Sequence, residues 1–169
     1  MITTDKGFQI RQAVADDIPF ILEVTREAFE KYVEMAGIEN TEALNETPED
    51  ILYDIENKYV FVAFIDGIPV GSVRVDIRDD KTAYLSRFGV RLAFQSNGIG
   101  KALMNVVDRT MIDAGVEKMI LHTASTVTSL VRFYYARGFY IDSTTKDRGY
   151  VRALLVKDYT KPLKKEKTW

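Results

Sequence analysis

The sequence predicts a mixed α/β fold in a single domain, with helices flanking a mostly antiparallel central sheet. Three observations carry this prediction. A chain of 169 residues with 46% hydrophobic content can build one core. Three strand-like segments follow one another closely between residues 59 and 90, as in an antiparallel meander. A glycine-rich turn, Gln95–Met104, then leads from the last of them into an amphipathic helix.

The order of elements begins with a strand over residues 8–14 and a helix over 18–32, for which Asp16 is a suitable N-cap. A polar stretch, residues 34–47, predicts a loop or a broken helix. A second helix is expected over 48–58, because a threonine that can cap it is followed by a proline at its first position.

Strands come next. Tyr59–Ile65 is an uninterrupted apolar run, which predicts a strand buried on both faces. Asp66 and Gly67 after it signal a hairpin, and further strands are expected over 70–77 and 82–90. In the strand over 70–77, side chains alternate, and three polar residues predict a solvated face: Arg74, Asp76 and Arg78.

The elements expected beyond the glycine-rich turn are a helix from about 100 to Gly115, a strand over 118–123, a helix over 128–137 closed by Gly138, and a last strand over 150–156. No repeat and no linker interrupts this order. We therefore expect one domain over residues 1–160 and a charged, solvated tail over 161–169.

Composition argues against several classes of function. The chain has no cysteine, hence no disulfide framework, thiolate nucleophile or cysteine-bound metal. His122 is the only histidine, so we expect no metal site. A net charge of −2 argues against nonspecific nucleic-acid binding. Met1–Gly7 lacks the apolar core of a signal peptide, and no apolar run is long enough for a membrane helix. We therefore expect no membrane partner and a cytoplasmic location.

Glycines at the start of a helix leave backbone N–H groups unpaired near the positive end of the helix dipole, which favours phosphate binding. A P-loop does not fit, because Gln95 and Ala102 stand where it needs a glycine and a hydroxyl residue. A dinucleotide fingerprint does not fit either, since Leu103 replaces a small residue and a meander precedes the turn.

Another motif fits. Gln95, Gly98 and Gly100, between a strand and a helix, resemble the Gln-x-x-Gly-x-Gly acyl-CoA-binding motif of the GNAT N-acetyltransferase superfamily. Residues 10–18 resemble that family's first strand and helix, and Phe133–Phe139 resembles its second motif, an aromatic-Tyr-x-x-x-Gly-Phe sequence. The order of elements matches that of single-domain bacterial members from about residue 8 to residue 157.

The resemblance implies a sheet that splays at the cofactor site and acetyl-CoA as cosubstrate. The strand before the turn would offer main-chain groups to the pantetheine arm, and the turn would wrap the pyrophosphate. The residues implied in cofactor binding are Phe88, Gly89, Val90, Gln95, Ser96, Asn97, Gly98, Ile99, Gly100 and Lys101. A glycine inside a strand, at position 89, independently indicates a bulge or a close backbone approach.

Acetyl transfer to an amine needs a neutral nucleophile and a proton for the departing thiolate. A lysine-like amine with a pKa near ~10.4 must first lose a proton to a base. Tyr134 matches the tyrosine of the family's second motif and is the expected proton donor to the thiolate; a packed aromatic is its structural alternative. Tyr135 points about 100° away around the helix and is the weaker candidate.

The general base stays open. Residues 84–88 hold no carboxylate, whereas many family members carry a glutamate there. His122 can accept a proton directly or through water, although a lone strand histidine is often structural, and Asp76 is another candidate. Leu92 and Val127 replace a proline and an asparagine that are frequent in the family, which leaves the cofactor contacts at those positions open.

The resemblance implies an N-acetyltransferase that moves an acetyl group from acetyl-CoA directly to a primary amine of a small molecule or protein. The alternative is a catalytically silent acyl-CoA-binding module, supported by the missing strand carboxylate. The acceptor would lie between residues 32–47 and 144–150. The first segment is acidic, which favours a cationic amine, whereas the basic residues near the second push the other way. Family members often dimerise, so a homodimer is an expectation that no residue here fixes.

Overall fold

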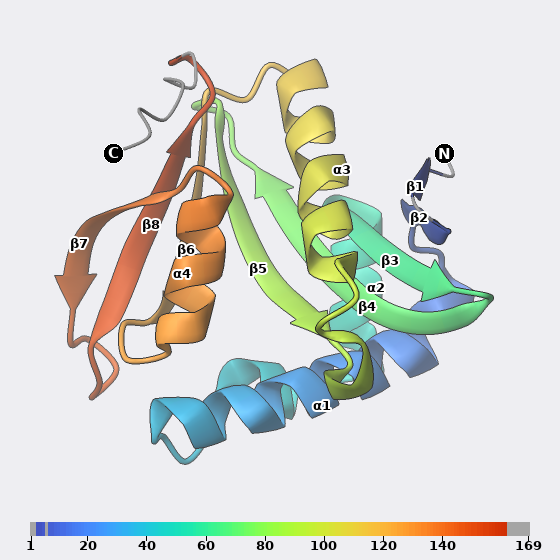
Figure 1. Ribbon diagram of the computed structural model, residues 1–169, viewed down its shortest axis with the longest axis horizontal. Helices are drawn as coiled ribbons and strands as arrows, with labels where there is room; N and C mark the ends of the chain where they lie inside the picture. Colours follow the sequence, from blue (N-terminus) through green and yellow to red (C-terminus); the bar gives the residue numbers. More distant parts are fainter. Residues whose placement is uncertain (1–2, 6, 162–169) are drawn as a thin grey trace.

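The computed structural model describes residues 3–5 and 7–161, and the predicted tail lies outside the described residues except for Lys161 (Figure 1). The helices are α1 (Ile18–Ala36), α2 (Pro48–Asn57), α3 (Ile99–Asp113) and α4 (Thr128–Ala136). The strands are β1 (Thr3–Asp5), β2 (Phe8–Gln12), β3 (Tyr59–Ile65), β4 (Ile68–Ile77), β5 (Thr82–Val90), β6 (Lys118–Ala124), β7 (Tyr140–Thr145) and β8 (Arg152–Asp158). Short 3-10 turns occupy Ala15–Asp17, Glu42–Asn45 and Leu92–Phe94.

The strands form one eight-stranded sheet in the order β1-β2-β3-β4-β5-β6-β8-β7. Every neighbouring pair is antiparallel except β5 and β6, which confirms the predicted mixed, mostly antiparallel sheet. The parallel pair is short: only Thr82–Tyr84 of β5 aligns with Lys118–Ile120 of β6. Beyond these residues the two strands diverge, and the sheet splays open (Figure 1).

Helices cover both faces of the sheet. On one face, α1 and α2 contribute Ile21 and Ile51 to a core that includes Val60 and Val62 of β3. Neighbouring residues of a strand point to opposite faces. Phe61 and Ala63 of β3 therefore belong to a second core on the other face, which α3 and part of α4 complete. The strand Tyr59–Ile65 is therefore buried on both faces at its centre, as its apolar run predicts.

Two helix starts follow the sequence signals. Before α2, the Thr47 hydroxyl accepts a hydrogen bond from the Asp50 N–H at 3.3 Å, and the Asp50 carboxylate accepts one from the Thr47 N–H at 2.9 Å. Before α3, Gly98 adopts a left-handed conformation with a φ of 81°. That helix ends where predicted, since Gly115 has a φ of 77°.

The expected N-cap at Asp16 is wrong. The residue that precedes α1 is Asp17, which is buried, whereas Asp16 is exposed. The Asp17 carboxylate accepts a hydrogen bond from the Val14 N–H at 2.8 Å and pairs with the Arg11 guanidinium at 2.6 Å. The preceding 3-10 turn shifts the cap by one residue, which local spacing alone does not reveal.

Two strands have no signature in the sequence. β1 has only three residues. All six residues of β7 are exposed, so no apolar alternation marks it, and it is held by its antiparallel pairing with β8. Among the residues that the structure describes, none of the helices combines the length and the apolar character that crossing a membrane requires.

Candidate active site

The turn before α3 presents a row of unpaired backbone donors. The first N–H of this helix to donate within the protein is that of Ala102, which bonds the Gly98 carbonyl at 3.1 Å. In the part of the chain that the structure describes, no acceptor is found for five N–H groups just before it: those of Ser96, Gly98, Ile99, Gly100 and Lys101. Such a row at a helix N-terminus suits the oxygens of a pyrophosphate. We call residues 96–101 the anion cradle.

The two glycines of the anion cradle are required for different structural reasons. Gly98 needs its left-handed backbone, and a Cβ there would meet nothing within 4 Å. Gly100 has an ordinary helical backbone, but a Cβ there would lie 3.1 Å from the ring of Phe88 and 3.6 Å from that of Phe133. Gln95 does not reach into the cradle, because its Nε2 donates to the Val90 carbonyl at 3.2 Å. Its side chain ties the turn to the end of β5.

β5 is bulged just before this end. Its register with β4 slips by one residue between the pairs at Ser72 and Arg74, and Arg87 has a φ of 53°. The Arg91 N–H donates to the Val70 carbonyl on β4, so alternation also turns the main-chain groups of Gly89 toward β4. Those of Val90 face away from β4, where the Gln95 side chain reaches the Val90 carbonyl.

Gly89 is also a point of close approach, as its place in a strand predicts. A Cβ there would lie 2.7 Å from the Cβ of Ala28 on α1. Only a glycine lets α1 pack this close to β5, and α1 in turn closes the end of the splay: the Tyr32 hydroxyl accepts a hydrogen bond from the Ala124 N–H at 2.8 Å.

A cavity of about 560 Å³ lies where β5 and β6 diverge. It is lined by both splayed strands, by α1 and α4, and by the connection between β7 and β8. Three of the residues that carry chemistry here are Tyr84 of β5, His122 of β6 and Tyr134 of α4. The structure thus brings His122 and Tyr134, the two predicted catalytic residues, to one cavity. Asp76 does not line it.

The strand register decides from which face of the sheet each group approaches the cavity. Val60 faces α1 and α2, and it pairs with Arg74 on β4. Asp76, two residues after Arg74, is on the same face and pairs with Tyr84 of β5. Tyr84 pairs with Ile120 of β6, so His122, two residues after Ile120, is on this face as well. Tyr134 belongs to the opposite core, with α3. Tyr134 and His122 therefore approach the splay from opposite faces.

Tyr134 sits in a cage of aromatic rings. Its ring centroid lies 5.4 Å from that of Phe133, 5.5 Å from that of Phe139 and 6.2 Å from that of Phe88. Only 5% of the residue is exposed, and this burial raises the pKa of its hydroxyl well above the usual value. The hydroxyl is consequently a neutral donor over the whole physiological range. Tyr135 is half exposed and does not line the cavity, in accord with its position around the helix.

His122 has a partner that the sequence analysis misses. The Tyr84 hydroxyl lies 2.7 Å from Nδ1 of His122. Burial, followed by the charge of Arg152, lowers the pKa of His122, and burial raises the pKa of Tyr84. Both groups are therefore neutral near pH 7, the state in which an imidazole can accept a proton. Alternation along β5 places Tyr84 on the cavity side, but only the register with β6 reveals its partner.

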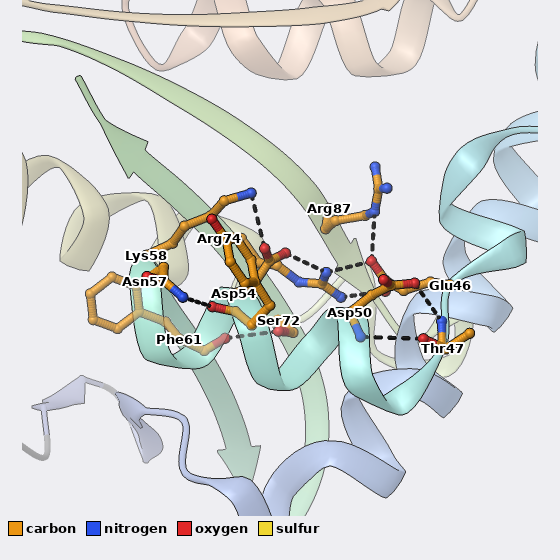
Figure 2. A network of polar contacts seen from close by, with 11 residues as sticks. Glu46, Thr47, Asp50, Asp54, Asn57, Lys58, Phe61, Ser72, Arg74 and Arg87 are labelled. Carbon is orange, nitrogen blue, oxygen red and sulfur yellow. Dashed lines mark hydrogen bonds and ion pairs between the residues drawn. The ribbon is translucent and has the colours of Figure 1, made fainter.

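Figure 2 shows a charged network beside the cavity that corrects the predicted solvated face. Arg74 is 0% exposed and lies between α2 and the sheet. Its guanidinium donates to both oxygens of Glu46 at 2.6 Å and to Asp54 at 2.9 Å. Arg87 reaches Glu46 at 3.2 Å and Lys58 reaches Asp54 at 3.0 Å. Arg74 is buried because α2 covers this side of β4. The alternation of side chains along one strand does not predict which side a helix covers.

Metal ligands do not gather in this region. Over residues 3–5 and 7–161, no group of three or more histidine, aspartate or glutamate side chains is arranged to hold a metal ion. The polar groups of the cavity are instead hydroxyls, the imidazole and charged side chains, most of them ion-paired. One of them, the buried hydroxyl of Thr123 on β6, has no hydrogen-bond partner among the described residues.

Comparison with known proteins gives one family and one fold. Residues 22–139 match the model of the acetyltransferase (GNAT) family. The paia N-acetyltransferase of Thermoplasma acidophilum, solved with coenzyme A, is similar with a TM-score of 0.79 and 23% identity, over 90% of this chain and 99% of that one. yncA of Salmonella typhimurium, solved with its cofactor acetyl-CoA, has a TM-score of 0.73 and 16% identity, over 94% and 98%.

A third similar structure is the ribosomal-protein-S18-alanine N-acetyltransferase of Escherichia coli, with a TM-score of 0.73 and 15% identity over 89% of this chain and 93% of that one. At these identities the likeness establishes a shared fold. The three proteins carry different names, so the fold by itself does not select an acceptor.

Proposed function

Because the chain belongs to the GNAT acetyltransferase family, we propose that it transfers the acetyl group of acetyl-CoA directly to a primary amine. The observation that carries this proposal is the convergence of the Tyr84–His122 pair and Tyr134 on one cavity, from opposite faces of the splayed sheet. One side supplies a base for the amine and the other an acid for the thiolate.

The donor side is formed by the anion cradle and the open edge of β5. Five N–H groups of the anion cradle, unpaired among the described residues, bind the pyrophosphate, with the helix dipole of α3 behind them. Phe88 and Val90 offer main-chain groups to the pantetheine amides across the gap that β6 leaves. The residues implied in cofactor binding also include Asn97 of the turn and Gly89, and we assign the main role of Gly89 to the packing of α1.

Acetyl-CoA supplies an activated acyl group as its thioester. The amine nitrogen bonds to the carbonyl carbon while the carbon–sulfur bond breaks. Nδ1 of His122 takes the amine proton through the Tyr84 hydroxyl, which gives up one proton as it receives another. Tyr134 gives its proton to the leaving sulfur, whose pKa as a free thiol is about 8.5 by analogy with cysteine. The tyrosinate and the protonated His122 return to their neutral forms by proton exchange with solvent as the products leave. The products are an N-acetylated amine and free coenzyme A.

The alternative is a catalytically silent acyl-CoA-binding module. It is supported by the lack of a carboxylate on residues 84–88. The Tyr84–His122 pair weighs against it, because it offers a neutral base where that carboxylate is missing.

A panel of small amines and peptide N-termini, read out by release of free coenzyme A, tests the proposal. Calorimetry with acetyl-CoA is run alongside. We expect acetyl-CoA to bind and at least one amine class to release coenzyme A above the hydrolytic background. Binding without release by any amine would support the silent module.

A further inference from the structure

The cavity between β5 and β6 carries more positive than negative charge. Five cationic side chains line it against three carboxylates. The cations are Lys58, Arg78, Arg87, Arg148 and Arg152, and the carboxylates are Glu42, Asp54 and Asp147. The acidic segment before α2 favours a cationic acceptor, whereas the excess of cations in the cavity lining favours an anionic one.

The carboxylates are already engaged within the protein. Asp54 is held by Arg74 at 2.9 Å and by Lys58 at 3.0 Å. Asp147 contacts Arg152 at 3.3 Å. Arg74 does not line the cavity, yet it binds one of the carboxylates that do. Arg74 also pairs with Glu46, which lies outside the lining as well, so the two charges cancel and the excess of cations over carboxylates in the lining stays the same.

Two of the cations are available for a ligand. Arg78 makes no ion pair within the residues that the structure describes, and its guanidinium lies 5.2 Å from the ring centroid of Tyr84. Arg148 reaches Glu42 only at 3.7 Å, and both of these side chains are largely exposed. Such a long, solvated pair holds an arginine weakly, so an incoming anion can take its place.

These charges surround the proposed base. Arg78, Arg148 and Arg152 line the same cavity as His122, and the Arg78 guanidinium lies over the ring of Tyr84, the hydrogen-bond partner of His122. Burial and then Arg152 lower the pKa of His122, Asp147 raises it, and Arg148 and Arg78 lower it further. Arg78 and Arg152 share the α1–α2 face with His122 through the strand register. The phosphates of the donor have a separate site, because no residue of the anion cradle lines this cavity.

We propose that the acceptor is a small amine that also bears an anionic group, a carboxylate or a phosphate, and that Arg78 and Arg148 bind this group while the amine reaches Tyr84 and His122. This inference rests on the proposed amine acetylation and adds the class of amine. A guanidinium binds either anion through two parallel hydrogen bonds. A polyamine would instead place a second positive charge among five others.

The test compares amines that differ only in the charged group. Short ω-amino acids are paired with their ω-amino amides, 3-aminopropyl phosphate with 3-aminopropanol, and 1,4-diaminobutane serves as the cationic member. The readouts are kcat/KM by release of coenzyme A and, independently, amine affinity by calorimetry in the presence of coenzyme A. We expect one anionic series to exceed its neutral partners by about tenfold to a hundredfold, and the better series identifies carboxylate or phosphate.

Variants connect this preference to the two arginines. Arg78→Gln and Arg148→Gln should each reduce the preference for the anionic amine at least severalfold, without changing affinity for acetyl-CoA. Arg109→Gln, an exposed arginine on α3 away from the cavity, is the matched control. Equal or better use of the neutral or cationic amines, or an anion preference that survives both variants, overturns the proposal.

Failure of the underlying activity gives a different result. If no amine releases coenzyme A, the proposed acetylation fails. The calorimetric comparison still decides whether the cavity prefers the anionic amines and whether Arg78 and Arg148 carry that preference.

Discussion

The Tyr84 hydroxyl and Nδ1 of His122 lie 2.7 Å apart, beside the last residue pair that joins β5 to β6. The hydrogen bond stands at the point where the sheet opens, with the cavity on one side and continuous pairing on the other. Since burial lowers the pKa of His122 and raises that of Tyr84, the pair is neutral near pH 7 and can accept one proton.

Tyr84→Phe should lower kcat by about tenfold to a hundredfold. This is at or below the lower end of what a positioned proton-transfer group contributes to a rate. The ring and its contact with Arg78 remain, but His122 loses its route to the amine. Affinity for acetyl-CoA should not change, because Tyr84 lies on the face away from α3. Steady-state kinetics and calorimetry measure both. Tyr140→Phe on β7, an exposed tyrosine, is the control, and an unchanged kcat would mean that His122 acts alone.

The pH dependence of kcat should show an acid limb with an apparent pKa below ~6.5, the unperturbed histidine value. Burial and Arg152 lower the pKa of His122, so the imidazole stays unprotonated to a lower pH than a free histidine. As pH falls through this folded-state pKa, the base gains a proton and activity is lost. The limb should disappear in His122→Gln. An acid limb well above 6.5 that survives the substitution would assign it to another group.

Folding stability should depend on pH through the same residue. The folded-state pKa of His122 is depressed, so the unfolded chain binds a proton first as pH falls. The contribution of neutral His122 to stability is therefore complete above the unfolded value of ~6.5 and is lost as pH falls below it. Urea unfolding of the wild type and of His122→Gln between pH 5 and 8 should show a steeper acid loss in the wild type. Parallel curves would contradict this.

Tyr134→Phe should reduce kcat by about a hundredfold while binding of acetyl-CoA stays nearly intact. Removing the hydroxyl keeps the ring among Phe88, Phe133 and Phe139, so packing is conserved. Coenzyme A release and calorimetry separate the two effects. Tyr135→Phe, the half-exposed neighbour on the same helix, is the matched control. Turnover that is unaffected by Tyr134→Phe would remove this hydroxyl from the reaction.

Gly98→Ala should weaken acetyl-CoA binding, because its left-handed backbone aims the N–H groups of the anion cradle. Gly67→Ala in the β3–β4 hairpin is a close control: both glycines have a φ near 80° and neither has an atom within 4 Å of a Cβ. Each variant should lose about 1–2 kcal/mol of stability from the strained backbone. Only Gly98→Ala should change the calorimetric affinity. Equal affinities in the two variants would contradict the assignment of the cradle.

Arg74→Met should destabilise the fold by up to about 3–5 kcal/mol, because Glu46 and Asp54 lose their shared cation and keep only one partner each, Arg87 and Lys58. Urea unfolding measures the loss. Arg109→Met, at an exposed position of α3, should stay within about 0.5 kcal/mol of the wild type. A similarly small effect at Arg74 would show that solvent reaches the carboxylates when the arginine is removed.

The features that the sequence determines by itself are local ones. The capping box at Thr47 and Asp50, the left-handed Gly98, and the apolar run of β3 each act over a few residues, so their patterns predict the elements that form. The glycine-rich turn predicts an anion site for the same reason, and its unpaired N–H groups follow directly from the start of α3. Compartment and assembly stay predictions.

The tertiary structure decides what the strands face. Tyr84 meets His122 across 38 residues of chain, and Arg74 meets Glu46 across 28. Alternation along a strand assigns side chains to two sides but does not say which side a helix covers, so the same Arg-Asp-Arg row that looks solvated holds one buried and one cavity-lining arginine. The proton route and the charge of the acceptor cavity depend on pairings between distant segments, and only folding brings those segments together.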